Sequence, residues 1–209
     1  NDPKESIIPV WHIISDPAYR NKGLGSELYQ SFYQDALAKA KKRGNVIKGV
    51  IGEAVGSVEG FLNRMGQKRM YFEDRKGNVH EVPYMCPPVD MDDETGEPRE
   101  EPMPEHVMLR LLNGEQKMPV EDLLRMVKAM YLEYTGAADN YDTKEAYQNS
   151  LGYNMQMIVN LARTLKQSKD GTVFMMSRKE RDVKRQELEG GGKQLIEVVT
   201  ETDTMGEGE

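Results

Sequence analysis

Apolar residues follow two different spacings in the first part of the chain. Residues 7–15 (IIPVWHIIS) form an apolar, largely β-branched run closed by an Asp-Pro pair, which predicts a largely buried strand. Over residues 25–43 the spacing changes, and Leu28, Phe32 and other apolar residues recur every three or four positions. Basic residues occupy the last turn of this stretch, where cations suit the helix dipole, and Gly44 follows. This stretch is therefore predicted to be an amphipathic helix.

Four further elements follow in short succession. Residues 46–55 predict a second strand. A short helix is predicted to begin at Ser57, a residue type that caps helices, and to end at Gly66. Residues 68–74 and 79–84 predict two strands that are joined by an Arg-Lys-Gly-Asn turn.

Residues 85–106 interrupt this order. They contain five prolines and eight acidic residues, a composition that predicts a mobile loop. The spacing of the acidic residues loosely resembles a calcium loop. However, the required glycine is displaced by one position and Pro98 lies inside, so no metal site is predicted. Strand character returns at residues 107–112.

Two amphipathic helices are predicted next. Pro119 begins the first and Gly136 ends it, whereas Thr143 caps the second, which stops before Gly171. Their apolar stripes must be buried, either on the strands or in a homodimer. The remaining residues combine a charged stretch at 178–189, three glycines, a short apolar piece and an acidic tail, and are predicted to form an appended arm.

Composition narrows the class of protein. Of the 209 residues 38% are hydrophobic, and no apolar run approaches the roughly 18 residues that a membrane span needs. No signal peptide is visible, and the single cysteine, Cys86, fits a reducing cytosol, so a cytoplasmic protein without membrane contact is predicted. Cys86 is interpreted as a small apolar filler. The net charge of −7 argues against a nucleic-acid partner and suits a cationic substrate such as an amine.

The segment between the first strand and the first helix has the chemistry of a phosphate-binding turn. Residues 20–26 read Arg-Asn-Lys-Gly-Leu-Gly-Ser. Gly23 and Gly25 lack a Cβ, which allows the backbone to turn tightly and to lie close to a ligand. The first amides of a helix have no partner inside it, and the helix dipole adds positive charge, so this end favours a pyrophosphate. Arg20 and Lys22 add further positive charge.

Two other phosphate motifs are excluded. A P-loop needs a Gly-Lys-Ser/Thr ending, which is absent, and the dinucleotide motif needs a third glycine where this chain has Leu28. The alternative is that Gly23 and Gly25 only allow the chain to turn and that no phosphate binds there.

Residues 16–25 (DPAYRNKGLG) resemble the signature Arg/Gln-x-x-Gly-x-Gly/Ala of the GNAT N-acetyltransferase superfamily, which follows a strand ending in a Pro-containing turn. The next predicted elements also fall in the order of that family, and the resemblance covers roughly residues 7–112. It implies an α/β fold with a GNAT-like mixed-sheet core over residues 1–113, the C-terminal part of that fold. A helical hairpin extension (114–171) and a charged arm with an acidic tail (172–209) would follow.

The resemblance also implies how acetyl-CoA, or another acyl-CoA, would bind. The first two strands would splay, the pantetheine arm would enter the gap between them, and backbone amides would hold the pyrophosphate. An amine of a small molecule or a protein would then attack the acyl carbon directly. The implied cofactor contacts are Ile13, Ile14, Ser15, Arg20, Asn21, Lys22, Gly23, Leu24, Gly25 and Ser26.

Amine attack needs a base, because an ammonium group has no lone pair. Glu53, near the end of the second strand, is the first candidate, and His12 is the alternative. The family commonly uses a tyrosine to protonate the departing thiolate, but Leu62 stands at that position in this chain. Tyr71 or Tyr84 is the candidate substitute for that tyrosine.

These departures leave three hypotheses. The first is an acyl-CoA-dependent N-acetyltransferase that acts on an amine. The second is a non-catalytic acyl-CoA-binding or interaction module of GNAT fold, and the third is a structural α/β domain. GNAT folds also place strands and helices of the acceptor pocket ahead of the first strand, where this chain has only residues 1–6.

Overall fold

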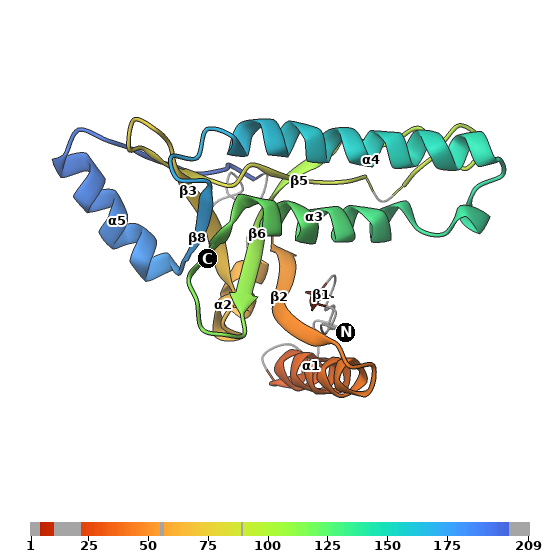
Figure 1. Ribbon diagram of the computed structural model, residues 1–209, viewed down its shortest axis with the longest axis horizontal. Helices are drawn as coiled ribbons and strands as arrows, with labels where there is room; N and C mark the ends of the chain where they lie inside the picture. The colour runs from red at the N-terminus through yellow and green to blue at the C-terminus, as the bar shows by residue number, and fades with distance from the viewer. Residues whose placement is uncertain (1–4, 11–21, 55–56, 89, 201–209) are drawn as a thin grey trace.

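The computed structural model describes residues 5–10, 22–54, 57–88 and 90–200 (Figure 1). This described part is a mixed α/β fold, with a nine-stranded sheet of parallel and antiparallel strands and five α-helices. The elements, in chain order, are β1 (Glu5–Val10), α1 (Leu24–Lys42), β2 (Val46–Ala54), α2 (Ser57–Arg64), β3 (Lys68–Glu73), β4 (Val79–Glu81), β5 (Tyr84–Cys86), β6 (Met103–Leu111), β7 (Lys117–Pro119), α3 (Val120–Thr135), a 3-10 turn (Ala138–Asn140), α4 (Lys144–Leu165), β8 (Thr172–Met176), α5 (Arg178–Gly190) and β9 (Leu195–Ile196).

The sheet begins with a parallel pair and continues mainly with antiparallel strands. β1 runs parallel to β2, from Glu5 opposite Val46 to Val10 opposite Gly52. Parallel neighbours need a crossover connection, and α1 lies in it. β6 then lies antiparallel between β2 and β3, which gives the order β1-β2-β6-β3. The splay predicted between the strands 7–15 and 46–55 is absent over residues 7–10, which pair with β2, and residues 11–15 lie outside the described residues.

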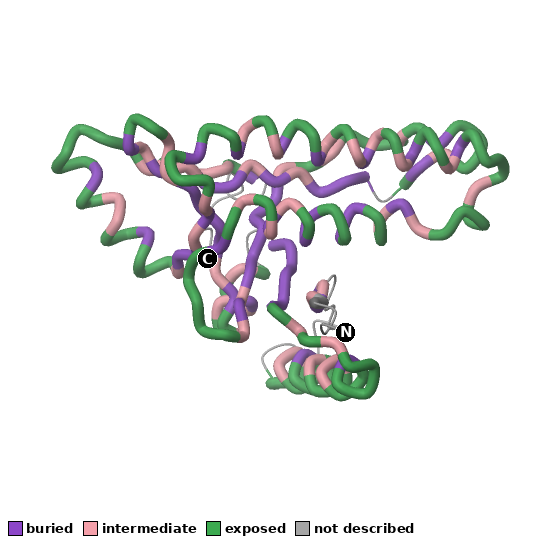
Figure 2. The backbone as a smooth tube through the Cα atoms, viewed as in Figure 1, coloured by how far each residue is buried: buried purple, intermediate pink, exposed green. Residues whose placement is uncertain are grey.

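Two apolar layers cover the sheet. The larger core lies between the sheet and the helical hairpin of α3 and α4, and it includes Ile51, Leu109 and Leu161. On the opposite face, Val50 of β2 packs with Tyr29 of α1. Figure 2 shows the central strands as buried and much of the outer surface of α1, α4 and α5 as exposed. Among the described residues, no helix is both long enough and apolar enough to cross a membrane.

Helix α1 buries a different face from the one that its apolar spacing predicted. Leu28 is 58% exposed and Phe32 is 49% exposed, whereas Tyr29 is 1% exposed. The Tyr29 hydroxyl accepts a hydrogen bond from Gln67 Nε2 at 3.2 Å, so its polar end is satisfied inside the core. The helix therefore turns Tyr29, Tyr33 and Ala36 toward β1 and β2, whereas Leu28 and Phe32 of the predicted apolar stripe stay exposed.

Residues after 171 contribute to the sheet. β8 pairs with β3 and β7, and its Val173 and Met175 belong to the same core as Ile51 and Leu161. Its side chains alternate between the core and the opposite face, as expected for a strand inside a sheet. The sequence did not predict this strand. One core thus crosses the predicted boundaries after residues 113 and 171.

The acidic stretch that was expected to be a mobile loop has a defined conformation. β5 pairs with the start of β6 inside it. Asp92 accepts hydrogen bonds from the amides of Glu94 and Thr95 at 3.0 and 2.8 Å, which closes a tight turn. Gly96 has a φ of 72° and lies against the backbone of Ala146 in α4. The turn is therefore held by local hydrogen bonds and by this close contact with α4.

Candidate functional site

Glu53 lies where the parallel pairing of β2 ends. Gly52 pairs with Val10, the last described residue of β1, and Glu53 follows it directly. Because side chains alternate along a strand, Glu53 shares the sheet face of Ile51, which packs in the core with α3. Glu53 is only 6% exposed. The predicted base therefore stands at the end of the strand pair but inside the larger core.

Two phenols and a thiol surround the Glu53 carboxyl. Tyr84 of β5 donates a hydrogen bond to Oε1, and Tyr134 in the last turn of α3 donates one to Oε2. The Cys86 sulfur lies 3.8 Å from Oε2 and 3.4 Å from the Tyr134 hydroxyl. Glu105 of β6 completes what we call the Glu53 cluster, with ligand atoms of Glu53, Cys86 and Glu105 all within 4.8 Å of one another.

Burial dominates the electrostatics of the Glu53 cluster. It raises the pKa of Glu53 to about 8, with a further rise from the neighbouring Glu105, while the hydrogen bonds from Tyr134 and Cys86 oppose it. Burial also raises the pKa of the Cys86 thiol and of the Glu105 carboxyl. Glu53 is therefore protonated near neutral pH, and its carboxylate is a stronger proton acceptor than an ordinary one.

The raised pKa of Glu53 predicts how stability depends on pH. The unfolded chain ionises this group near its ordinary pKa of 4.5, whereas the folded chain keeps the proton until about pH 8. The stabilisation from the bound proton is thus complete below the lower value and is lost as pH rises through the upper one. Glu53→Gln, which cannot titrate, should flatten the decline of the unfolding free energy with pH in this window, measured by urea denaturation. Parallel curves for wild type and variant would contradict a buried, titrating Glu53.

The residue types of the cluster also suit a metal ion, because zinc takes thiolate and carboxylate ligands. Glu53, Cys86 and Glu105 would be its ligands. Both oxygens of Glu53 already accept phenol hydrogens, so a metal ion at either oxygen would compete with the hydrogen bond of Tyr84 or Tyr134.

The turn before α1 is described from Lys22 onward. Gly23 is the N-cap of α1 with a φ of 83°, and a Cβ placed there would meet nothing within 4 Å. The Gly23 carbonyl accepts the amide of Ser26 at 3.0 Å, so that predicted phosphate donor is engaged by the helix. The amides of Leu24 and Gly25 have no acceptor within the helix and are the ones suited to an anion.

The remaining predicted site residues lie outside the described residues. They are the alternative base His12 and the cofactor contacts Ile13, Ile14, Ser15, Arg20 and Asn21. Their roles stay predictions. Within the described part, the phosphate site is represented by the exposed residues Lys22 and Gly23 and the first turn of α1.

Tyr71 lies on the opposite face of the sheet from Glu53. It is 0% exposed, and its hydroxyl donates a hydrogen bond to Glu197 at 3.0 Å. Its neighbour Met70 points to the larger core, so the alternation of β3 directs Tyr71 away from the Glu53 cluster. The proposed substitution of Tyr71 for the family tyrosine is therefore not supported by its position. Tyr84, the other tyrosine considered, contacts Glu53 directly.

Charged residues surround Tyr71 and join α2, β3, β4, β6 and α5. Arg69 bonds to Glu81 at 3.3 Å, and Arg181 bonds to Glu59 at 2.6 Å. Buried charges are stable when they are paired in this way, which makes the network a structural feature. We call it the Arg69–Arg181 network, and its members are Glu59, Arg69, Tyr71, Glu81, His106, Arg181 and Glu197.

The sequence did not assign chemistry to three residues of the Glu53 cluster. Tyr134 lies in the amphipathic helix predicted after Pro119, Glu105 lies in the acidic stretch, and Cys86 was interpreted as filler. Leu62, at the position of the family tyrosine, packs with Ala54 and Met108 and is 3% exposed. Glu53 was the one signal in the sequence for these partners. A carboxyl in an apolar strand needs hydrogen-bond donors, and tyrosine has a largely apolar side chain that carries a donor.

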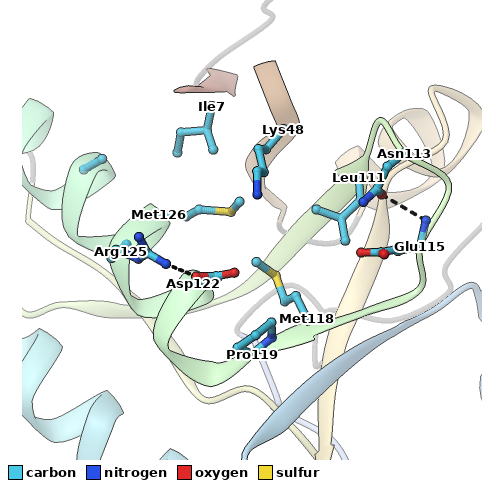
Figure 3. Close-up of a pocket in the computed structure, with 11 residues that line it drawn as sticks. Ile7, Lys48, Leu111, Asn113, Glu115, Met118, Pro119, Asp122, Arg125 and Met126 are labelled. Atoms are coloured by element: carbon cyan, nitrogen blue, oxygen red, sulfur yellow. Dashed lines mark hydrogen bonds and ion pairs between the residues drawn. The ribbon is translucent and has the colours of Figure 1, made fainter. Parts of the chain in front are cut away.

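A pocket of about 410 Å³ lies at the other end of β2 from Glu53. It is bounded by Ile7 of β1, Lys48 of β2 and the first turns of α3. In Figure 3, Lys48 projects toward Met118 and Met126, over an apolar floor with charged side chains at its edge. None of the predicted site residues that are described lines it.

Comparisons with known proteins give no relative. No family model, no curated protein and no solved structure matches the chain.

Proposed function

We propose that the chain is an acyl-CoA-dependent N-acyltransferase of GNAT type, which transfers an acetyl group from acetyl-CoA directly to an amine. The observation that carries this proposal is that Glu53 and the first turns of α1 lie on the two faces of the same parallel strand pair, β1 and β2. A Cβ at Gly52 would lie 3.2 Å from Gln67 Oε1, and Gln67 Nε2 donates to Tyr29 in the second turn of α1. These contacts bring the start of α1 close to the end of β2, on the opposite face from Glu53.

The described start of α1 is compatible with a phosphate group. Gly23 has the left-handed backbone that favours glycine, and a Cβ added there would meet none of the described residues within 4 Å. The amides of Leu24 and Gly25 point out of the helix end, and Lys22 is exposed beside them. These groups would hold the pyrophosphate of acyl-CoA.

Glu53 would serve as the general base on the other face. With a pKa near 8, its carboxylate can take the proton that an attacking ammonium group must lose. When bound, acyl-CoA would supply the activated thioester whose acyl group is transferred. The acceptor would be an amine of a small molecule or a protein in the cytoplasm, in keeping with the acidic net charge of −7.

A second candidate function is a non-catalytic acyl-CoA-binding module of the same fold. Two observations favour it: Leu62 replaces the family tyrosine, and Glu53 is only 6% exposed. Binding of acetyl-CoA without turnover across a panel of amines would select this function.

Replacing Gly23 with aspartate should abolish binding of acetyl-CoA, because the new carboxylate adds strain at a left-handed position and repels phosphate. In a thermal-shift titration, wild type should gain roughly 5–10 °C in Tm at about 100 times the Kd, and Gly23→Asp should gain none. Gly114→Asp is the matched control, since Gly114 has a φ of 80° and equally open space but lies after β6. No shift in wild type, or an equal shift in Gly23→Asp, would overturn the proposal.

A further inference from the structure

Tyr84 and Tyr134 hold the Glu53 carboxyl from a strand of the sheet and from the end of a helix, respectively. Tyr84 is 0% exposed, and its ring lies 5.6 Å from that of Tyr131. Tyr134 is only partly buried and belongs to the last turn of α3, which ends at Gly136 with a φ of 70°. Of the two phenols, Tyr134 is the one whose backbone lies outside the sheet.

Within the described part of the chain, the Glu53 carboxyl is enclosed while Tyr134 stays in place. Oε1 accepts the Tyr84 hydroxyl, and Oε2 accepts the Tyr134 hydroxyl and faces the Cys86 sulfur at 3.8 Å. A carboxyl that is this enclosed cannot contact the nitrogen of an acceptor. An acceptor amine must therefore take the position that the Tyr134 hydroxyl occupies.

That position is surrounded by groups that accept hydrogen bonds from a cation. Glu53, Cys86 and Glu105 bring their ligand atoms within 4.8 Å of one another. A primary ammonium group carries three N–H donors and is small enough to reach all three groups. The Tyr131 hydroxyl is engaged by the Met85 carbonyl at 2.5 Å, and α4 contributes apolar residues to this core.

We propose that Tyr134 is the gate of the acceptor site and that the acceptor is a primary alkylammonium group. The ammonium displaces the Tyr134 hydroxyl from Glu53 Oε2 and binds between Glu53 and Glu105. This inference rests on the proposed acyl transfer. Tyr134 acts through Glu53 and is a positioning residue, whereas Glu53 accepts the proton.

Binding of butylammonium to the full chain tests the gate without any reaction. Tetramethylammonium is the matched probe, because it has the same charge but no N–H donor. In carbon-13 NMR spectra, butylammonium should shift the Glu53 carboxyl and Tyr134 ring signals together, and tetramethylammonium should shift neither. Equal responses to the two cations, or a shift of Glu53 without Tyr134, would overturn the proposal.

Two near-isosteric variants sharpen this test. Tyr134→Phe should bind butylammonium about tenfold more tightly, because no phenol hydrogen bond has to be displaced. Glu105→Gln should bind it at least about tenfold more weakly, because it loses a charged acceptor. Tyr153→Phe on α4, where the side chain is partly buried and outside the Glu53 cluster, should leave affinity unchanged.

Kinetics separate the gate from the proposed function. With acetyl-CoA and butylamine, Tyr134→Phe should lower the KM for the amine about tenfold and change kcat much less. Transfer with an unchanged KM in this variant refutes the gate and leaves acyl transfer standing. Butylammonium binding as described, without any transfer, refutes the acyltransferase and leaves the ammonium site standing.

Discussion

Replacing Gly96 with alanine should lower the free energy of unfolding by about 3 kcal/mol. The residue has a φ of 72°, where an L side chain is strained, and the added methyl would overlap the backbone carbonyl of Ala146 in α4. A helix backbone cannot rotate away as a flexible side chain can, so the acidic turn must separate from α4. Urea denaturation measures the loss.

Two other glycines separate the causes of this loss. Gly114 has a φ of 80° with nothing near its added Cβ, so Gly114→Ala should cost only the backbone strain of about 1 kcal/mol. Gly152 lies inside α4 with open space, so Gly152→Ala should stabilise the chain by about 0.5–1 kcal/mol. If Gly96→Ala costs no more than Gly114→Ala, the acidic turn is not packed on α4.

Replacing Glu53 with glutamine should lower kcat for acetyl transfer at least about a hundredfold, because the amide cannot accept the amine proton. The thermal shift with acetyl-CoA should survive, since the start of α1, where we propose that the phosphates bind, lies on the opposite face of the sheet. Glu133→Gln, the same change on the exposed surface of α3, is the control and should keep full activity. An active Glu53→Gln enzyme would remove Glu53 from the mechanism.

The pH profile of the wild type provides an independent check on the base. Because burial raises the pKa of Glu53 to about 8, kcat/KM should fall about tenfold for each pH unit below that value. An ordinary exposed carboxyl is already ionised in this pH range, so kcat/KM would not change with its titration. A profile without this acidic limb would mean that another group takes the proton.

The elements with long, regular spacing could be predicted from the sequence. Pro119 and Thr143 precede α3 and α4 as expected, and the Thr143 hydroxyl accepts the Ala146 amide at 3.0 Å. The face that a helix buries was harder to predict. The tyrosine of α1 is buried because Gln67, far away in sequence, satisfies its hydroxyl. β8 was missed because five residues carry too little periodicity to distinguish a strand from a loop.

The candidate site was predictable only at its centre. Glu53 stood out because it interrupts an apolar strand next to a glycine. Tyr84 was named only as a possible proton donor, and its contact with Glu53, like that of Tyr134, could not be predicted, because the two tyrosines lie 31 and 81 residues away. Tyr71 illustrates the same limit, because a tyrosine on a strand gives no sign of which sheet face it will occupy.

The Arg69–Arg181 network has a consequence for how the chain is made. Arg181 and Glu197 leave the ribosome after every strand of the central order β1-β2-β6-β3, yet they neutralise charges buried on α2 and β3. Arg69 also pairs with Glu59 and Glu81, so the charges of α2, β3 and β4 can meet before the later residues are made. Arg181 and Glu197 then add the last ion pairs and tie α5 and the segment after β9 to this side of the sheet.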